Sequence, residues 1–138
     1  MVPDSIVIDG TRQGRCNLVS IDRQRIPLQP VGFRFFAMLG IQLVLGEDDG
    51  WVCASKLYRP EEIVARYIYR MKQNIYNAVP RLQSWRVVEN DRQCRYRLIA
   101  KPETIFIEPV GIRQFGDYDL ERMVDKLLLI EKEQLSYR

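Results

Sequence analysis

One stretch of the chain, residues 31–45, constrains the fold more than any other. Pro30 opens it, and large apolar side chains such as Phe33, Phe36 and Leu39 occupy most of its positions. The stretch is too long for an ordinary strand, and its apolar side chains spread over more than one side of a helix. The pattern therefore predicts a central helix that is buried on most sides.

Short elements are expected on both sides of this helix. Turn residues such as Gly14 separate the β-rich runs that precede it, which predicts a small antiparallel sheet. These runs are residues 5–8, 16–21 and 25–28. After the acidic loop 46–50 we expect a short bridge at 51–52, a brief helix at 54–58, a helix at 60–77 and a hairpin with arms 85–88 and 94–98. A strand at 104–107 and an amphipathic helix from Asp117 complete the chain.

The predicted helix 60–77 has two different faces. Its apolar stripe consists of Ile63, Val64, Tyr67, Ile68, Met71 and Ile75. The other side carries Arg66, Tyr69, Gln73, Tyr76 and Asn77, with Arg70 and Lys72 on the flanks. Pro60 suits the first helical position, and Pro80 ends the helix. Side chains of these types can read base edges in the major groove of DNA, and a merely solvated face is the alternative.

Positive charge is concentrated around this helix. Residues 54–101 contain 11 Lys and Arg against four Asp and Glu, a net charge of +7. Residues 1–53 carry −1 and residues 102–138 carry −3, which leaves +3 for the whole chain. Such clustering is expected of a phosphate-binding surface. A basic patch can also bind an acidic protein, so charge alone leaves both kinds of partner open.

Several classes of function are not expected. The chain has no histidine, which removes the commonest general base, and no Asp or Glu pair sits in a recognisable catalytic setting. Its three cysteines are widely spaced, so neither a disulfide framework nor a zinc site is predicted. We expect neither an enzyme nor a bound metal or cofactor. Because no signal peptide or bilayer-spanning apolar run is found, we expect a cytoplasmic protein without a membrane partner.

The predicted hairpin repeats the basic character of the helix before it. Alternation in its second arm directs Arg95 and Arg97 to one face and Cys94, Tyr96 and Leu98 to the other. A basic-faced hairpin that follows a basic-faced helix is typical of the second half of a winged helix.

Three short motifs, in this order of elements, resemble the winged-helix effector domain of OmpR/PhoB-type response regulators. Residues 26–36, IPLQPVGFRFF, are similar to the family's v-x-L-T-P-x-E-F-x-L-L entry to its first helix. Residues 64–75 resemble V-D-V-H-I-S-R-L-R-K-K-L, with matches at Val64, Ile68 and Arg70. Residues 95–98, RYRL, are similar to the G-Y-R-L that ends the wing. The resemblance covers about residues 5–100.

Three departures from the family pattern accompany these matches. Gly32 replaces the family's Glu, Arg95 replaces the wing Gly, and the connector between Leu57 and Val64 is several residues shorter. Many members use that connector to contact RNA polymerase, so its near absence argues against such contact here. No receiver domain precedes the winged helix in this chain, so phosphorelay control is not encoded in it; the sequence can equally be one domain of a larger protein.

The resemblance implies an α+β fold, a winged helix-turn-helix with an N-terminal antiparallel β-sheet and a C-terminal wing hairpin. It places this domain in residues 1–101 and leaves residues 102–138 as an appendage with an added C-terminal amphipathic helix. Such a protein is expected to bind specific double-stranded DNA as a transcriptional regulator, with helix 60–77 in the major groove and wing 85–98 on the backbone. The alternative is a winged-helix protein–protein interaction module that does not bind DNA.

Residue roles follow partly from the family and partly from the helical projection. Arg70 and Lys72 resemble DNA-contacting positions of the family, and the projection adds other polar residues of the same helix. On the wing, Arg95 and Arg97 are expected to meet phosphate or the minor groove. The predicted DNA-binding residues are Arg66, Tyr69, Arg70, Lys72, Gln73, Asn77, Arg95 and Arg97.

The C-terminal helix carries an apolar stripe that must be covered by something. Its members are Leu120, Met123, Val124, Leu127, Leu128, Ile130 and Leu135, whereas Leu129 falls outside. Winged helices commonly read two half-sites as dimers, so we predict a homodimer paired through this stripe. Folding back onto its own domain is the alternative, and a protein partner on the basic face or on this helix is possible.

Overall fold

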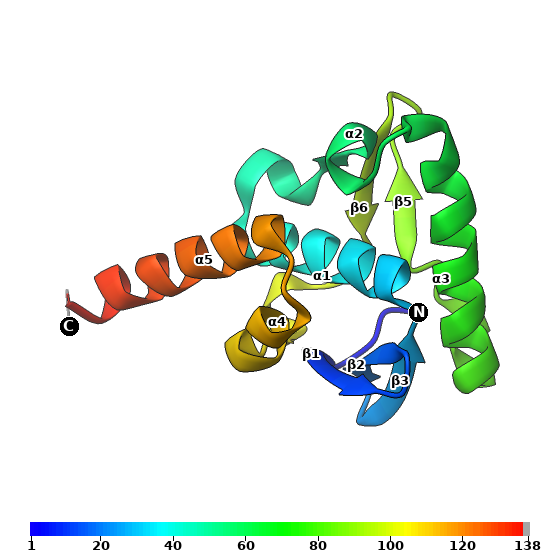
Figure 1. Ribbon diagram of the computed structural model, residues 1–138, viewed down its shortest axis with the longest axis horizontal. Coiled ribbons are helices and arrows are strands. Elements are labelled where there is room, and N and C mark those ends of the chain that lie inside the picture. The colour runs from blue at the N-terminus through cyan, green and yellow to red at the C-terminus, as the bar shows by residue number, and fades with distance from the viewer. Residues whose placement is uncertain (137–138) are drawn as a thin grey trace.

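Helix α1 (Pro30–Leu45) runs through the centre of the computed structural model, which describes residues 1–136 (Figure 1). Nine of the ten positions 32–41 of this helix are buried, all except Arg34, and Phe33, Phe35 and Phe36 are fully inaccessible to solvent. Gly46 ends the helix in the left-handed conformation, and its N–H donates to the carbonyl of Gln42. The prediction of a central helix buried on most sides is confirmed.

A four-stranded sheet packs against one side of α1, with the strand order β3-β2-β1-β7. Strands β1 (Ile6–Gln13), β2 (Cys16–Ile21) and β3 (Gln24–Leu28) are antiparallel, as predicted. Their inward side chains form the core face of the sheet: Ile6, Ile8, Val19, Ile21, Ile26 and Leu28. Strand β7 (Ile105–Ile107) adds a parallel edge to β1.

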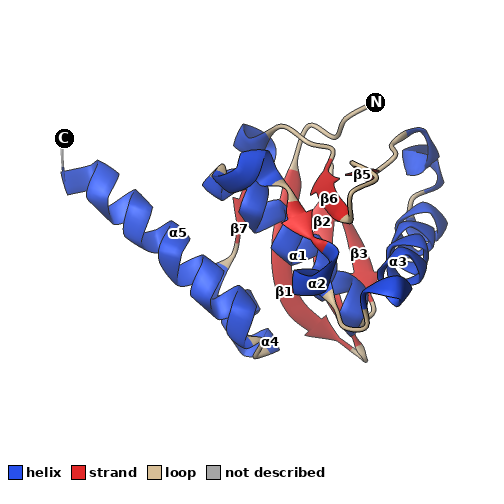
Figure 2. Ribbon diagram, turned by 90° about the horizontal axis from the view of Figure 1, so that it is seen from above, coloured by secondary structure: helices blue, strands red, loops and turns tan. Residues whose placement is uncertain are grey.

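A three-stranded sheet contains the hairpin, in the order β4-β6-β5. Figure 2 shows its strands β5 and β6. Its strands are β4 (Val52–Cys53), β5 (Val88–Asn90) and β6 (Arg95–Leu98). The predicted first arm, residues 85–88, is wrong. Trp85 instead caps the 3-10 turn η3 (Pro80–Ser84), and Val87 has a positive φ of 70°, which lies outside the β region and is rare for a β-branched residue. The strand therefore starts only at Val88.

Two short helices connect the hairpin sheet to the long basic helix. They are α2 (Ala54–Leu57) and the 3-10 turn η2 (Glu61–Ile63), after which α3 (Val64–Ala78) begins. The prediction that Pro60 is the first helical residue is wrong. Its ψ of 145° is extended, and it only precedes η2. Ile63, with a ψ of −2°, separates the tight turn from the regular helix. The predicted helix 60–77 thus starts four residues late and extends one residue further.

The C-terminal part of the chain shares its core with the rest. Besides β7 it contains the 3-10 turn η4 (Pro102–Thr104), an unpredicted helix α4 (Pro109–Phe115) and helix α5 (Tyr118–Ser136). Ile107, Ile112 and Leu120 belong to the same buried cluster as α1. Gly10 and Gly111 allow the backbones of β1 and α4 to touch, because a Cβ on either glycine would overlap the other segment. The expected boundary after residue 101 therefore does not separate two cores.

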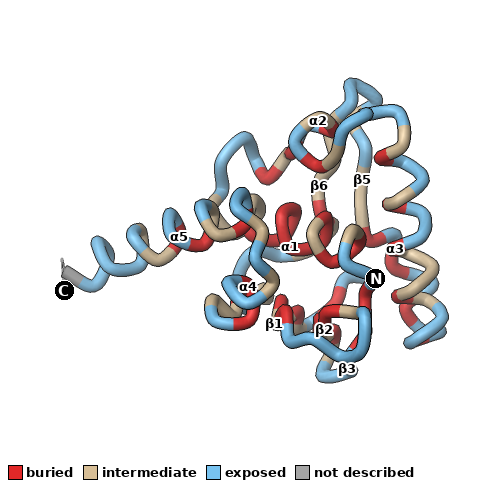
Figure 3. The backbone as a smooth tube through the Cα atoms, in the orientation of Figure 1, coloured by how far each residue is buried: buried red, intermediate tan, exposed pale blue. Residues whose placement is uncertain are grey.

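Helix α5 is covered along its first half and projects from the molecule along its second half (Figure 3). Leu120, Val124 and Leu127 are buried in the core that includes α1, so three residues of the predicted dimerisation stripe are covered within the chain. Met123 and Leu128 are half-buried against the same core. Ile130 is also half-buried. Leu135 stays 67% exposed. The first half of α5 therefore folds back onto its own domain, which was the alternative to pairing with a second copy.

An arginine on α1 anchors the start of α5. The guanidinium of Arg34 donates to the carboxylates of Asp117, at 2.7 Å, and Asp119, at 3.1 Å. The same guanidinium also donates to the backbone carbonyl of Leu57 at the end of α2. One half-buried side chain therefore joins α1, α2 and α5. The remaining short element, the 3-10 segment η1 (Glu47–Gly50), forms the acidic loop.

Candidate nucleic-acid interface

Helix α3 lies at one edge of the molecule, at the opposite end from the tip of α5 (Figure 1). Four residues of the predicted apolar stripe are buried, namely Val64, Ile68, Met71 and Ile75, whereas Tyr67 is half-buried and Ile63 precedes the helix in η2. Phe35 on α1 and Tyr58 after α2 contact the ring of Tyr67, with centroids 6.0 and 5.1 Å away. These contacts hold the rotation of α3 about its axis, so one face is always directed outward.

The outward face of α3 carries the predicted polar side chains. Arg66, Arg70 and Asn77 are exposed, Tyr69 is 63% exposed, and Gln73 is half-buried. The helix contains three cations and no carboxylate. Among residues 1–136, no ion-pair partner lies within 4 Å of the guanidinium of Arg66 or Arg70. The positive charge of this face is therefore not neutralised by the protein itself.

One side chain of α3, that of Tyr76, does not lie on the outward face as the helical projection predicted. The hydroxyl of Tyr76 donates to the carbonyl oxygen of Trp85 at 2.6 Å, and burial raises the pKa of this phenol. Tyr76 therefore fastens α3 to the segment that leads into β5 and does not belong to the outward face. Lys72 is half-buried on the same flank of the helix. The guanidinium of Arg70 lies 5.7 Å from the centroid of the Tyr67 ring.

The predicted wing arginines both have carboxylate partners inside the hairpin. Nε of Arg95 lies 2.5 Å from Asp91, and Nε of Arg97 lies 2.6 Å from Glu89. Both guanidinium groups also lie over the ring of Trp51, at 5.5 and 4.4 Å from its centroid. Arg95 and Arg97 thus hold the β4-β6-β5 sheet together, and the hairpin presents less free positive charge than the sequence suggested.

The carboxylate of Asp91 organises the hairpin tip. It accepts from the backbone N–H groups of Gln93, at 2.7 Å, and Arg95, at 3.0 Å. Partial burial alone would raise the pKa of Asp91, but these amides and the Arg95 guanidinium together hold the pKa below its usual value. The tip therefore keeps an ionised carboxylate, which repels phosphate next to the two wing arginines.

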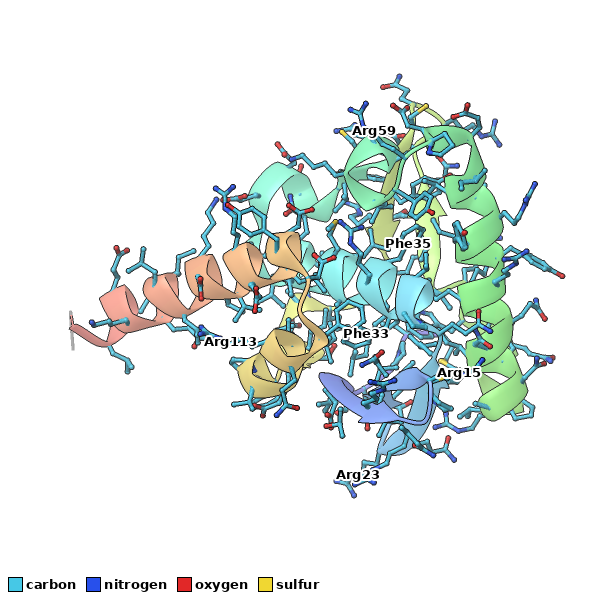
Figure 4. All side chains as sticks on the ribbon, in the orientation of Figure 1. Arg15, Arg23, Phe33, Phe35, Arg59 and Arg113 are labelled. Carbon is cyan, nitrogen blue, oxygen red and sulfur yellow. The ribbon has the colours of Figure 1, made fainter. Side chains whose placement is uncertain are left out.

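One cation that the sequence did not single out lies beside α3. Arg15, in the turn between β1 and β2, borders a groove of about 380 Å³ together with Arg70 and Asn74 of α3. Figure 4 shows Arg15 between the sheet and α3, whereas Arg23, in the next turn of the sheet, lies at its far end. A single arginine in a turn carries no motif, so sequence patterns could not identify it.

Comparisons with known proteins do not add a relative. No family model matches the chain, and no curated protein or solved structure is significantly similar to it. Within residues 1–136, no three His, Cys, Asp or Glu side chains are grouped so as to hold a metal ion. No helix in this part of the chain has the length and apolar character needed to cross a membrane.

Proposed function

We propose that this protein binds double-stranded DNA by inserting the outward face of α3 into the major groove, as a sequence-specific transcriptional regulator. The observation that carries the proposal is the uncompensated charge of that face. It holds two exposed arginines without carboxylate partners in residues 1–136, next to the hydrogen-bonding side chains of Tyr69 and Gln73. A surface of this kind attracts phosphate and can then read bases.

The arrangement around α3 supports the same proposal. A helix with its side chains is about 10–12 Å in diameter and the major groove is about 12 Å wide, so an α3 that stands at the edge of the molecule can enter it. The chain order α1, α2, α3 and then a β5–β6 hairpin is that of a winged helix. We therefore propose the winged helix-turn-helix as the finer description of this α+β fold.

Each side chain of the face has a role that its chemistry suits. Arg66 and Arg70 are proposed to donate to guanine O6 and N7, and Gln73 and Asn77 to pair with adenine. Tyr69 is proposed to contact a sugar or a thymine methyl group, and Lys72 a phosphate.

The hairpin contributes less to this proposal than α3 does. Arg95 and Arg97 each bind a carboxylate through Nε, which neutralises part of the charge that either could offer to a phosphate. This same pairing is the one observation that favours the alternative function. In that alternative, the winged helix does not bind DNA and uses the basic face to bind an acidic protein surface.

Titration of random-sequence duplex DNA with the full chain separates the two functions. DNA binding predicts measurable affinity at low salt, with the logarithm of the association constant falling linearly with the logarithm of salt concentration, by about 0.9 for each phosphate contacted. Fluorescence anisotropy of a labelled duplex gives both the affinity and the slope. A protein that shows no binding at the lowest salt concentration favours the protein–protein module and contradicts DNA binding.

We also propose that the projecting half of α5 pairs with a second copy of the chain. Glu131 and Lys132 flank the line that joins Leu128 to Leu135, so two parallel copies would place opposite charges against each other on either side of these leucines. The two copies would then contact two half-sites on DNA.

Replacing Leu135 with glutamate is expected to abolish this pairing, because a charge would enter the apolar contact. Sedimentation of the wild type should give the mass of two chains at high protein concentration, and Leu135→Glu should give the mass of one. Leu129→Glu is the matched control, because Leu129 is 57% exposed but lies off the stripe. A wild type that sediments as one chain at every concentration contradicts the pairing.

A further inference from the structure

We infer that Arg15, in the turn between β1 and β2, binds the DNA backbone beside α3, so that the sheet carries a phosphate contact in addition to the hairpin. This inference rests on the proposed insertion of α3 into the major groove. It assigns a nucleic-acid phosphate to a groove that lies between two separate elements, the β1–β2 turn and α3.

The charge that borders the groove is positive, although most of its lining is apolar. Arg15 and Arg70 are its charged residues, Gln29 and Asn74 add amide groups, and no Asp or Glu lines it. Both guanidinium groups are exposed, and in the described chain neither has a carboxylate within 4 Å. Two like charges that face one groove repel each other, and a shared phosphate would remove that repulsion.

The position of Arg15 is held by the sheet. Gln13 and Cys16 pair across β1 and β2, which leaves only Gly14 and Arg15 in the turn. Arg15 also borders a second groove, whose lining includes Arg12 and contains no carboxylate. The first turn of α1, which contributes Pro30, Val31 and Gly32 to the main groove, contains no acidic residue either. No carboxylate therefore lines either of the two grooves that Arg15 borders.

Arg15 and the hairpin lie beside opposite flanks of α3, so a phosphate contact by Arg15 would be separate from any contact made by the hairpin. Arg70 and Asn74, which line the groove, lie on one flank of the helix. Tyr76, which bonds to Trp85 and so to the hairpin segment, lies on the other. When a helix occupies the major groove, phosphates run along both of its sides. Arg15 meets the strand on the side that the hairpin does not reach.

The test compares Arg15→Ala with Arg23→Ala in the full chain. Both arginines are exposed turn residues of the same sheet, but Figure 4 shows Arg23 away from α3. Losing one phosphate contact should reduce the salt slope by about 0.9 and the affinity about fivefold to tenfold at 0.1 M salt, equally for every duplex sequence. Arg23→Ala should match the wild type, and Arg15→Lys should recover most of the affinity.

The possible results separate this inference from the function on which it rests. A wild type that binds duplex DNA, together with an Arg15→Ala variant of unchanged slope and affinity, overturns the role of Arg15 and leaves α3 as the reading helix. Equal losses in Arg15→Ala and Arg23→Ala also overturn it, because net charge then explains the effect. A wild type that binds no duplex overturns the proposed function itself, and this inference with it.

Discussion

Replacing Arg66 and Arg70 together with alanine is expected to lower the affinity for duplex DNA about 30-fold or more and to remove sequence preference. Each arginine that contacts a base contributes about 1–3 kcal/mol, and about 2 kcal/mol in total already corresponds to a 30-fold loss. The folded state should be unaffected, because both side chains are exposed and neither has an ion-pair partner among the described residues. Anisotropy titrations and thermal unfolding measure the two quantities.

A second double variant controls for the loss of two positive charges. Arg113 on α4 and Arg122 on α5 are exposed and lie on helices at the other end of the molecule from α3 (Figure 4). Replacing both with alanine changes the net charge by the same amount and should leave affinity within about twofold. If the two double variants bind DNA equally well, α3 is not the reading helix.

Replacing Gly111 with alanine is expected to destabilise the protein by about 3 kcal/mol or more, or to prevent folding. A Cβ at this position would overlap the carbonyl group of Asp9, which belongs to the backbone of β1. Backbone cannot move aside as a side chain can, so α4 would have to separate from the sheet and expose Ile112, which is fully buried. Chemical denaturation of the purified variant gives the free energy of unfolding.

Gly14 supplies the comparison for this substitution. Its φ of +61° also disfavours alanine, but a Cβ there would meet no atom within 4 Å. Gly14→Ala should therefore cost only about 1–2 kcal/mol, the strain of a left-handed residue. Equal stability of the two variants would show that α4 does not pack on β1, and that the C-terminal segment does not share the core.

Elements that depend on local patterns could be predicted from the sequence. The apolar stretch that forms α1 and the turn residues around β1, β2 and β3 are signals contained within a few residues. Strand β7 pairs with β1 across about a hundred residues of chain, and no local pattern specifies such a partner. Helix α4 is one short segment with Pro109 at its start, too short for a helical period to be read.

The error in the hairpin has a physical cause. Residues 85–88 alternate as a strand would, yet Trp85 is fully buried and its indole N–H donates to the carbonyl of Ile99 at 2.7 Å. This contact, together with the positive φ of Val87, delays the strand until Val88. Tertiary packing of one large side chain therefore overrides the local alternation.

The positions of some residues of the candidate site could be predicted from the sequence, whereas the partners of others could not. The outward position of Arg66, Tyr69 and Arg70 follows from helical periodicity, which the buried stripe of α3 enforces. The partners of Tyr76 and Arg97 come from another segment and from the opposite arm of the hairpin, and that of Arg95 from the hairpin tip, so these side chains looked free in the sequence. Pairing of a charge depends on the folded structure, whereas its position on a helix does not.

The most direct measurement of where DNA binds is a titration of the ¹⁵N-labelled protein with duplex DNA, followed by the backbone amide resonances. Contact through α3 predicts that the largest shift changes fall in residues 66–77 and at Arg15, with little change at Leu129 and Leu135 on the projecting half of α5. Changes that leave residues 66–77 unaffected, or the absence of any change at low salt, would contradict the proposal that the outward face of α3 binds DNA.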